Sequence, residues 1–195
     1  MDASVAPSGA VRIRGAHPDE LEALVDIERR SSARFADVPG LEHWVGGDLT
    51  PISALEDAQR DRLVLVAEIA DESGAVERVG WCYAVPKDDS LFVEQIDVLP
   101  EYGRRGIGRS LLDALAPIVA ERGLQALTLT TDAHVAWNRP WYESLGFVVL
   151  PPDEQGPDVA AAVADEARRG FDLSRRVAMR RPLSRSGEQP ADTAS

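Results

Sequence analysis

Apolar residues along this chain recur at two alternating periods, and this alternation constrains the fold more than any other feature. Residues 11–14 (VRIR) alternate apolar and polar side chains as a short strand does, whereas the apolar residues between 21 and 27 recur at helical spacing. The same patterns predict further strands at 63–69, 76–85, 91–98, 124–131, 147–150 and 176–181, and helices at 52–60, 107–121, 139–145 and 158–169. Pro117 predicts a kink or an early stop in the helix at 107–121. Strands that alternate with helices in this way indicate a mixed α/β layer.

The length of 195 residues, with 44% hydrophobic and 28% charged residues, indicates one folded domain, which we place at 11–183. Residues 1–10 and 184–195 are small, polar and contain proline, so we expect both ends to be disordered. The single cysteine, Cys82, excludes an internal disulfide and a cysteine-rich metal site, and we expect no metal. Because no apolar run reaches the roughly 18–20 residues of a membrane span and no signal peptide begins the chain, we expect a cytoplasmic protein without a membrane partner.

The net charge of −12 argues against a nucleic-acid partner, because phosphate binding requires a basic face. The charge is uneven: it is −11 within residues 1–100 and −1 within residues 101–195. The first half is therefore suited to attract a cationic substrate, and the second half tolerates an anionic ligand. The alternative is an acidic surface that serves only solubility.

A strand that runs into a glycine-rich turn and then into a helix, at 98–112, is the most informative segment. The first N–H groups of a helix point outward and carry roughly half a positive charge between them. Gly106 and Gly108 have no Cβ, so an anion can approach the backbone closely, and Arg104, Arg105 and Arg109 add full positive charges. This combination is typical of a phosphate or pyrophosphate site.

Three known glycine motifs can be compared with this turn, besides a turn whose glycines serve packing only. The dinucleotide fingerprint G-x-G-x-x-G does not match the order Gly103-x-x-Gly106-x-Gly108. The phosphate loop G-x-x-x-x-G-K-[ST] matches except that Arg109 stands in place of lysine. The coenzyme A loop of the GNAT N-acetyltransferase superfamily, [RQ]-x-x-G-x-[GA] after a V-x-P strand end, resembles this segment, with Val98-x-Pro100 at the right distance. The sequence departs from it at Gly103, where the family has Arg or Gln, so the usual side-chain contact is shifted to the following arginines.

A second motif, Trp141-Tyr142-x-x-Leu145-Gly146-Phe147, resembles the superfamily signature F-Y-x-x-x-G-F. The resemblance covers residues 11–182. It implies a central mixed, mostly antiparallel sheet that is splayed at the fourth strand and flanked by helices. It also implies acetyl-CoA as co-substrate and an amine as acceptor, in a small molecule or a peptide.

Acetyl transfer to an amine requires an acid for the departing thiolate and a base for the amine proton. The resemblance assigns the acid to Tyr142, with a packing aromatic as the alternative. The base is assigned to Glu94, in the strand that leads to the glycine turn; Asp97 is its rival, and Glu28 is a candidate to line the acceptor site. A surface carboxylate is the alternative for each of the three.

Coenzyme binding is assigned by the same resemblance to the strand end, to the glycine turn and to the second motif. The residues concerned are Ile96, Asp97, Val98, Arg104, Arg105, Gly106, Ile107, Gly108, Arg109, Ser110, Asn138 and Tyr142. Asn138 stands four residues before the tyrosine, whereas the family has its asparagine seven residues before it. Its alternative role is to cap the short helix that follows, and both roles are compatible.

We therefore expect an N-acetyltransferase that transfers acetyl from acetyl-CoA to a primary amine by direct attack. A non-catalytic acyl-CoA-binding or regulatory module of the same fold is the first alternative, and a phosphate-loop nucleotide phosphotransferase the second. The acceptor stays open among polyamines, aminoglycosides, amino acids and peptide amines, with a slight preference for a cationic amine. A homodimer is compatible with the resemblance.

Overall fold

The computed structural model describes residues 9–183 of the chain, and their contacts divide them into two compact units. Unit 1 comprises residues 9–85 and 93–114, and unit 2 comprises residues 86–92 and 115–183. The segments 1–8 and 184–195, which belong to the ends predicted to be disordered, lie outside the described residues. Gly9 and Ala10 are described and have no regular secondary structure.

Seven strands of the described chain follow one another in the order β1-β2-β3-β4-β5-β7-β6. Their bounds are β1 Val11–Gly15, β2 Val64–Ala70, β3 Val76–Lys87, β4 Ser90–Val98, β5 Ala126–Asp132, β6 Val148–Val149 and β7 Arg176–Pro182. β2 pairs antiparallel with β1 and β3, and β7 pairs antiparallel with β5 and β6, whereas β4 and β5 are parallel. The register of that parallel pair runs from Ser90–Ala126 to Phe92–Thr128, although both strands continue beyond these residues. The predicted mixed, mostly antiparallel sheet is thereby confirmed.

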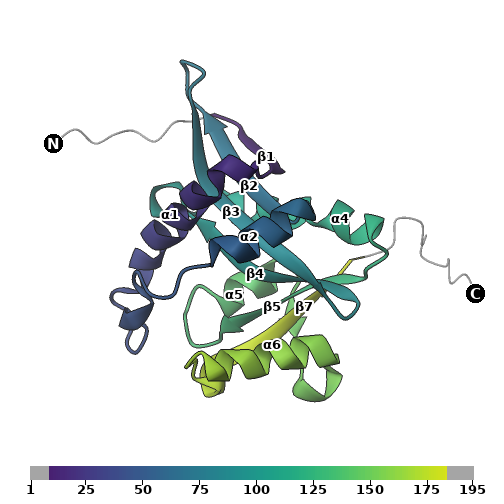
Figure 1. Ribbon diagram of the computed structural model, residues 1–195. Helices are drawn as coiled ribbons and strands as arrows, with labels where there is room; N and C mark the ends of the chain where they lie inside the picture. Colours follow the sequence, from purple (N-terminus) through teal and green to yellow (C-terminus); the bar gives the residue numbers. More distant parts are fainter. Residues whose placement is uncertain (1–8, 184–195) are drawn as a thin grey trace, which may run out of the picture. The chain divides into compact units, whose positions relative to one another are not determined.

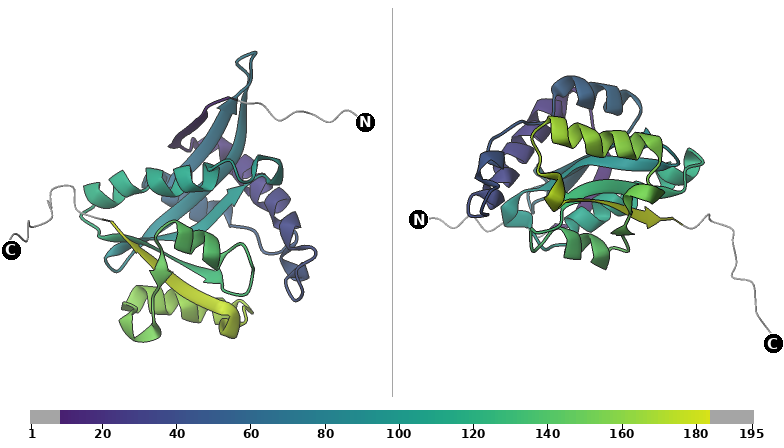
Figure 2. Two further views of the ribbon diagram at one scale, coloured as in Figure 1. Left: turned by 180° about the vertical axis from the view of Figure 1, so that it is seen from behind. Right: turned by 90° about the horizontal axis from the view of Figure 1, so that it is seen from below.

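In unit 1, helices cover both faces of the strands (Figures 1 and 2). α1 and α2 lie side by side on one face, and α3 lies on the other face, where it packs on β1 and β2. The helical elements of this unit are η1 Pro18–Glu20, α1 Leu21–Ser31, η2 Ser32–Phe35, η3 Glu42–Trp44, α2 Ile52–Arg60, η4 Pro100–Tyr102 and α3 Ile107–Ala114. The apolar positions predicted to form the inner stripe of α1 are buried, and so are Leu55 of α2 and Leu111 of α3. Burial of these stripes on the sheet stabilises the unit.

The helix predicted at 107–121 is interrupted, as the position of Pro117 predicts. α3 ends at Ala114, and α4 (Ala116–Glu121) begins after Leu115. Proline has no N–H to donate, so it is accommodated in the first turn of α4, where that donor would have no intrahelical acceptor.

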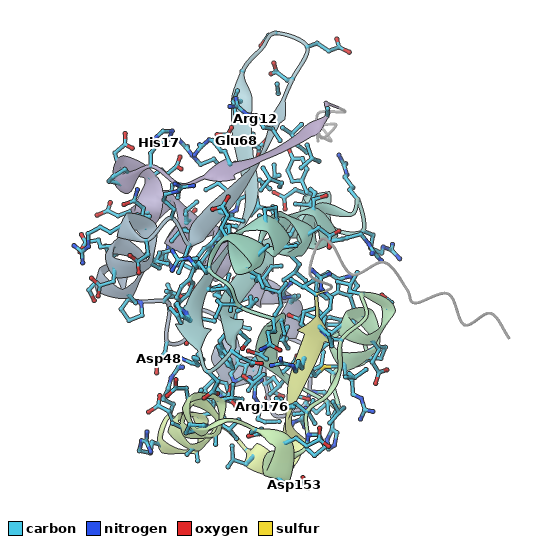
Figure 3. All side chains as sticks on the ribbon, turned by 90° about the vertical axis from the view of Figure 1, so that its right-hand side faces the viewer. Arg12, His17, Asp48, Glu68, Asp153 and Arg176 are labelled. Atoms are coloured by element: carbon cyan, nitrogen blue, oxygen red, sulfur yellow. The ribbon has the colours of Figure 1, made fainter. Side chains whose placement is uncertain are left out.

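Unit 2 has α6 on one face of its strands and α5 on the other (Figures 1 and 2). Besides α4, the helical elements of unit 2 are α5 Arg139–Ser144, η5 Pro152–Glu154, α6 Pro157–Arg168 and η6 Leu173–Arg175. A largely buried ion pair joins α6 to the strands: Arg176 of β7 donates to both carboxylate oxygens of Glu166, at 2.6 and 3.0 Å. Figure 3 shows Arg176 beside this helix. Phe147 and Met179 form part of the apolar core of the unit.

A second ion cluster joins η1 to β1, β2 and β3 of unit 1. Glu20, whose side chain is 3% exposed, accepts hydrogen bonds from Arg14 at 2.5 and 2.8 Å, from Arg78 at 2.7 Å and from the backbone N–H of His17 at 2.8 Å. Arg14 also donates to Glu68 of β2, which lies beside β1 in Figure 3. Two carboxylates and two guanidinium groups therefore neutralise one another at this edge.

Candidate functional site

The glycine-rich turn of unit 1 has the backbone geometry of an anion-binding site. Gly106 has a φ of +80°, a conformation that disfavours any residue with a Cβ, and α3 begins directly after it. The backbone N–H of Ser110 donates to the carbonyl of Gly106 at 3.0 Å, which closes the first turn of the helix. The amides of Ile107, Gly108 and Arg109 thus belong to the first turn, where N–H groups point out of the helix at the positive end of its dipole. Gly106 is exposed, so solvent reaches this helix end.

Arginine side chains surround the turn. Arg104, Arg105 and Arg109 are all exposed, and Arg104 adopts a φ of +59° although it is not a glycine. Arg105 lies over the ring of Tyr102, with its guanidinium carbon 5.1 Å from the ring centroid. Three positive charges at a helix N-terminus suit a diphosphate ligand.

Tyr102 is the buried support under this turn. Its side chain is within the core, and its hydroxyl donates to Glu77 of β3 at 2.6 Å. Burial, and next the hydrogen bond to Glu77, raise the pKa of Tyr102 to about 12, so the hydroxyl stays protonated. The ring therefore holds Arg105 in place without contributing a charge of its own.

β4 carries its candidate residues on two faces. Gln95 and Asp97 share one face, because the amide of Gln95 donates to the carboxylate of Asp97 at 2.6 Å. Glu94, Ile96 and Val98 alternate with them and share the other face, and all three are partly exposed. The alternation of β4 therefore places the two candidate bases, Glu94 and Asp97, on opposite faces of the strand.

Asp97 is 2% exposed and is bonded on all sides. Besides Gln95, its carboxylate accepts from the hydroxyl of Ser31 and from Arg34 at 2.7 Å. Burial raises the pKa of Asp97, and the charge of Arg34 together with the hydrogen bonds of Ser31 and Gln95 opposes that rise. Its interactions tie β4 to the end of α1 and to η2.

Glu28 on α1 is also buried. Both of its carboxylate oxygens accept from the backbone N–H of Thr50, at 3.1 and 3.3 Å. Thr50 lies two residues before α2 begins at Ile52, so Glu28 fixes this end of the connection from α1 to α2. Glu28, which the sequence suggests as a residue of the acceptor site, therefore has a structural role.

The second motif forms the short helix α5 and the turn after it in unit 2. Tyr142 is 9% exposed and packs with Trp141 and Phe147, with ring centroids 4.8 and 5.5 Å apart. The carbonyl of Tyr142 accepts from the backbone N–H of Phe147 at 3.1 Å, and Gly146 makes the reversal possible with a φ of +85°. The motif glycine is therefore required by the backbone, and Tyr142 has an aromatic neighbour on each side.

Asn138 stands at the N-cap position of α5, but its side chain makes no capping hydrogen bond. Its backbone makes the hydrogen bonds at this end of the helix: the N–H of Asn138 donates to the carbonyl of Val135 at 3.0 Å, and its carbonyl accepts from the N–H of Tyr142 at 3.1 Å. The capping position predicted for Asn138 is right, whereas the side-chain bond that defines a cap is missing.

Sequence reasoning missed the residues that hold the turn before α5. Asp132 at the end of β5 is 1% exposed and bonds to the backbone of the following residues and to Arg175. An aspartate directly after a strand and before a loop is a signal for such a turn. Its partner lies 43 residues away along the chain and could not be read from the pattern.

The structure places the predicted site residues in both units. Ile96, Asp97, Val98 and the turn residues 104–110 lie in unit 1, as does Glu94, and Asn138 and Tyr142 lie in unit 2. Within residues 9–183, no group of three or more His, Cys, Asp or Glu side chains is placed to hold a metal ion. None of the helices in that range is both long and apolar enough to cross a membrane.

Comparisons with known proteins identify the family of the chain. The model of the acetyltransferase (GNAT) family matches residues 23–147. Among solved structures, the PaiA N-acetyltransferase from Thermoplasma acidophilum in complex with coenzyme A is 16% identical, with a TM-score of 0.62, over 89% of this chain and 99% of that one.

Two further solved structures have the same fold. The ribosomal-protein-S18-alanine N-acetyltransferase from Escherichia coli is 22% identical, with a TM-score of 0.60, over 92% of this chain and 97% of that one. The ribosomal-protein-alanine N-acetyltransferase from Brucella melitensis is 23% identical, with a TM-score of 0.57, over 88% and 99%. Since the family model covers more than half of the sequence, the chain belongs to the acetyltransferase (GNAT) family and is an acetyl-CoA-dependent N-acetyltransferase.

Proposed function

We propose that this enzyme transfers acetyl from acetyl-CoA to a cationic primary amine by direct attack of the amine on the thioester. The turn at 103–110 binds the pyrophosphate of the coenzyme, Tyr142 protonates the departing sulfur, and Glu94 takes up the proton of the amine. The observation that carries the proposal is the turn itself, in which an exposed glycine at positive φ opens a helix among three arginines.

The turn supports diphosphate binding in two complementary ways. Backbone N–H groups of the first turn of α3 and the helix dipole favour a negative ligand without any side chain. Arg104, Arg105 and Arg109 add charge-assisted hydrogen bonds, each typically stronger than a neutral one. A lysine, which a nucleotide phosphate loop requires, is absent from residues 103–110, and this disfavours the phosphotransferase alternative.

Glu94 is preferred to Asp97 as the base because of what surrounds the two carboxylates. Asp97 is buried and its oxygens already accept from Ser31, Arg34 and Gln95. Glu94 is partly exposed and stands on the opposite face of the strand, so water or substrate can reach it. A base must come within hydrogen-bond reach of the proton that it removes.

The single cysteine supports direct attack over a covalent acetyl-enzyme. Cys82 is fully buried, and burial raises the pKa of its thiol to about 12. The thiolate is the nucleophilic form of cysteine, and almost none of it exists at neutral pH with such a pKa. The amine itself is then the group that attacks the thioester.

A cationic acceptor is supported by the charge of unit 1. Residues 1–100, most of which belong to this unit, carry a net charge of −11. The connection from α1 to α2 exposes Asp37, Glu42 and Asp48, and long-range attraction of this kind raises the local concentration of cations.

Coenzyme binding is tested first, by calorimetry with coenzyme A and with 3′-dephospho-coenzyme A. We expect micromolar binding of both, weakened as salt increases, because the diphosphate is common to the two ligands. Pantetheine, which has no diphosphate, should bind at least about tenfold more weakly. Equal affinity for pantetheine would contradict a diphosphate site at the turn.

Turnover is tested by release of the coenzyme thiol with a panel of amines. The panel contains spermidine, lysine, glutamate and a peptide with N-terminal alanine, the last because two structural neighbours are named for that acceptor. We expect the polyamine to give the highest kcat/KM, and a glutamate or neutral peptide that outperforms it would overturn the cationic preference. No thiol release with any amine, together with tight coenzyme binding, would favour the non-catalytic module.

The acid is tested by the variant Tyr142→Phe. The ring and its packing against Trp141 and Phe147 are kept, so the affinity for acetyl-CoA should change by less than about twofold, whereas kcat should fall by about 10²-fold. A variant with unchanged kcat would remove this role from Tyr142.

A further inference from the structure

The turn between β5 and α5 is held by one buried carboxylate. Asp132, the last residue of β5, accepts through Oδ1 from the backbone N–H groups of His134 and Val135, at 2.8 and 3.0 Å. Its other oxygen, Oδ2, accepts from Nε of Arg175 at 2.8 Å. Each oxygen of this carboxylate thus has a separate task.

Arg175 holds the same segment a second time through its backbone. Its carbonyl accepts from the N–H of Ala133 at 2.7 Å. Arg175 is itself fixed, because its N–H donates to the carbonyl of Asp172, and the side chain of Asp172 accepts from Ser174 at the start of η6. This anchor lies in the part of the chain after Phe147, beyond the segment that the family model matches.

A short chain of hydrogen bonds leads from this anchor to the tyrosine. Val135, which Asp132 holds by its N–H, accepts at its carbonyl from the N–H of Asn138. Asn138 in turn accepts from the N–H of Tyr142 at 3.1 Å. Three consecutive links therefore connect the carboxylate of Asp132 with the backbone of Tyr142, all within unit 2.

We propose that Asp132 and Arg175 are positioning residues, which fix the turn at 133–138 and thereby set the place of the Tyr142 hydroxyl. This inference rests on the proposed function, in which that hydroxyl protonates the sulfur. Misplacement of a catalytic group by about 1 Å can cost up to 10²-fold in rate, so a pair that holds the turn affects chemistry without touching the substrate.

The electrostatics of Asp132 fit an anchor. Burial would raise the pKa of Asp132, but the hydrogen bonds from Arg175, His134 and Val135 outweigh burial and hold that pKa below its usual range. The carboxylate is therefore ionised at neutral pH, with its oxygens directed at fixed donors. An ionised, fully engaged carboxylate is a poor proton acceptor and a strong structural link.

Two variants remove the ion pair and leave the backbone bonds. In Asp132→Asn, the amide oxygen still accepts from His134 and Val135, and the amide nitrogen cannot accept from Arg175. In Arg175→Met, the carbonyl that accepts from Ala133 is kept and the charge is lost. We expect each variant to lower kcat by about tenfold and to change the KM for acetyl-CoA by less than about twofold.

A double-mutant cycle separates positioning from a general loss of structure. In the background of Tyr142→Phe, which has no hydroxyl to position, Asp132→Asn should lower kcat by less than about twofold. The same roughly tenfold loss in both backgrounds would overturn the proposal, as would a wild-type kcat in the two single variants. The ion pair of Asp89 and Arg180, with two bonds of 2.8 Å in the same unit, is the matched control, and Asp89→Asn should affect both backgrounds equally.

Hydrogen exchange gives a readout that does not depend on turnover. The backbone N–H groups of Asn138 and Tyr142 should exchange about tenfold faster in Asp132→Asn and Arg175→Met than in the wild type, and unchanged exchange would overturn the proposal. If Tyr142→Phe alone leaves kcat unchanged, the acid role in the proposed function fails. Hydrogen exchange then still decides whether the pair holds the turn.

Discussion

Replacing Glu20 by glutamine tests the energetic role of the ion cluster in unit 1. Burial raises the pKa of Glu20, but the hydrogen bonds from Arg14, from the N–H of His17 and from Arg78 outweigh it and lower that pKa from 4.5 to about 2. Glutamine has nearly the same shape, so the variant removes the charge and one acceptor without leaving a cavity.

The magnitude follows from the linkage between protonation and folding. A carboxyl whose pKa is lower in the folded state stabilises the fold above its unfolded pKa, and that contribution disappears as the pH falls through the folded pKa. For a pKa of 4.5 unfolded and about 2 folded, Glu20 contributes about 3.5 kcal/mol at pH 7 and about 2 kcal/mol at pH 3.5. About 1.5 kcal/mol is therefore lost between these two pH values.

Urea unfolding at pH 7 and pH 3.5 measures both quantities. We expect the free energy of unfolding of Glu20→Gln to be about 3 kcal/mol lower than that of the wild type at pH 7. At pH 3.5 this difference should be smaller by about 1.5 kcal/mol. Glu56→Gln, the same chemical change at an exposed position of α2, should change stability by less than about 0.5 kcal/mol at either pH. A difference between Glu20→Gln and the wild type that does not narrow at low pH would refute the reasoning.

Three further variants test the glycine turn, the start of α6 and the thiol of Cys82. In Gly106→Ala the added Cβ has no atom within 4 Å, so the loss of stability arises from the φ of +80°. We expect the free energy of unfolding in urea to fall by about 1 kcal/mol and acetyl-CoA to bind about tenfold more weakly by calorimetry. Wild-type affinity would contradict a role of the turn in coenzyme binding. Asp88 accepts from the N–H groups of Asp158 and Val159 at the start of α6. Asp88→Asn keeps one acceptor and tolerates the positive φ of this position, so it should lower the free energy of unfolding by about 1 kcal/mol and speed the hydrogen exchange of the α6 amides. Unchanged exchange would contradict the capping role of Asp88. Cys82→Ala should keep kcat within about twofold, and a loss of acetyl transfer would indicate a covalent route.

Local patterns were sufficient for most elements of the fold. The strand predicted at 76–85 is β3 (Val76–Lys87), and the helix predicted at 158–169 is α6 (Pro157–Arg168), so these bounds differ by two residues or fewer. The strand predicted at 147–150 is shorter, with only Val148 and Val149 in β6. The N–H of Phe147 bonds to the carbonyl of Tyr142 in α5 instead of to a strand, whereas the N–H of Leu150 still bonds to Ala178 of β7, just beyond the end of β6. Periodicity reports which face is buried, whereas strand ends depend on partners elsewhere in the chain.

The candidate site could be predicted only where its chemistry is encoded locally. The glycine turn is a short run that could be recognised from its own residues, and the tyrosine motif is one that could be recognised from its resemblance to a family signature. The engagement of Asp97 by Ser31 and Arg34, more than 60 residues away, and the grip of Arg175 on Asp132 depend on how distant segments pack. The periodicity of apolar residues does not predict such contacts between distant segments.

Arg104, and not the neighbouring Gly103, adopts the positive φ that favours glycine, and this yields a last prediction. Gly103 has a φ of −58°, which any residue adopts, whereas Arg104 has a φ of +59°, where a residue with a Cβ costs roughly 1–2 kcal/mol. A Cβ at position 103 would lie 3.1 Å from the carbonyl oxygen of Pro100, so a side chain there is also unfavourable. Strain of this kind is concentrated at functional sites, which agrees with the coenzyme contact proposed for Arg104.

Asparagine tolerates the left-handed region, so Arg104→Asn separates stability from binding. We expect this variant to gain about 0.5–1 kcal/mol in urea unfolding and to bind acetyl-CoA about tenfold more weakly, with a smaller dependence on salt. Arg104→Lys keeps both the charge and the strain, so it should unfold like the wild type and bind within about threefold of it. If Arg104 served the fold alone, Arg104→Asn would bind the coenzyme like the wild type, because relief of strain by itself removes no contact with a phosphate.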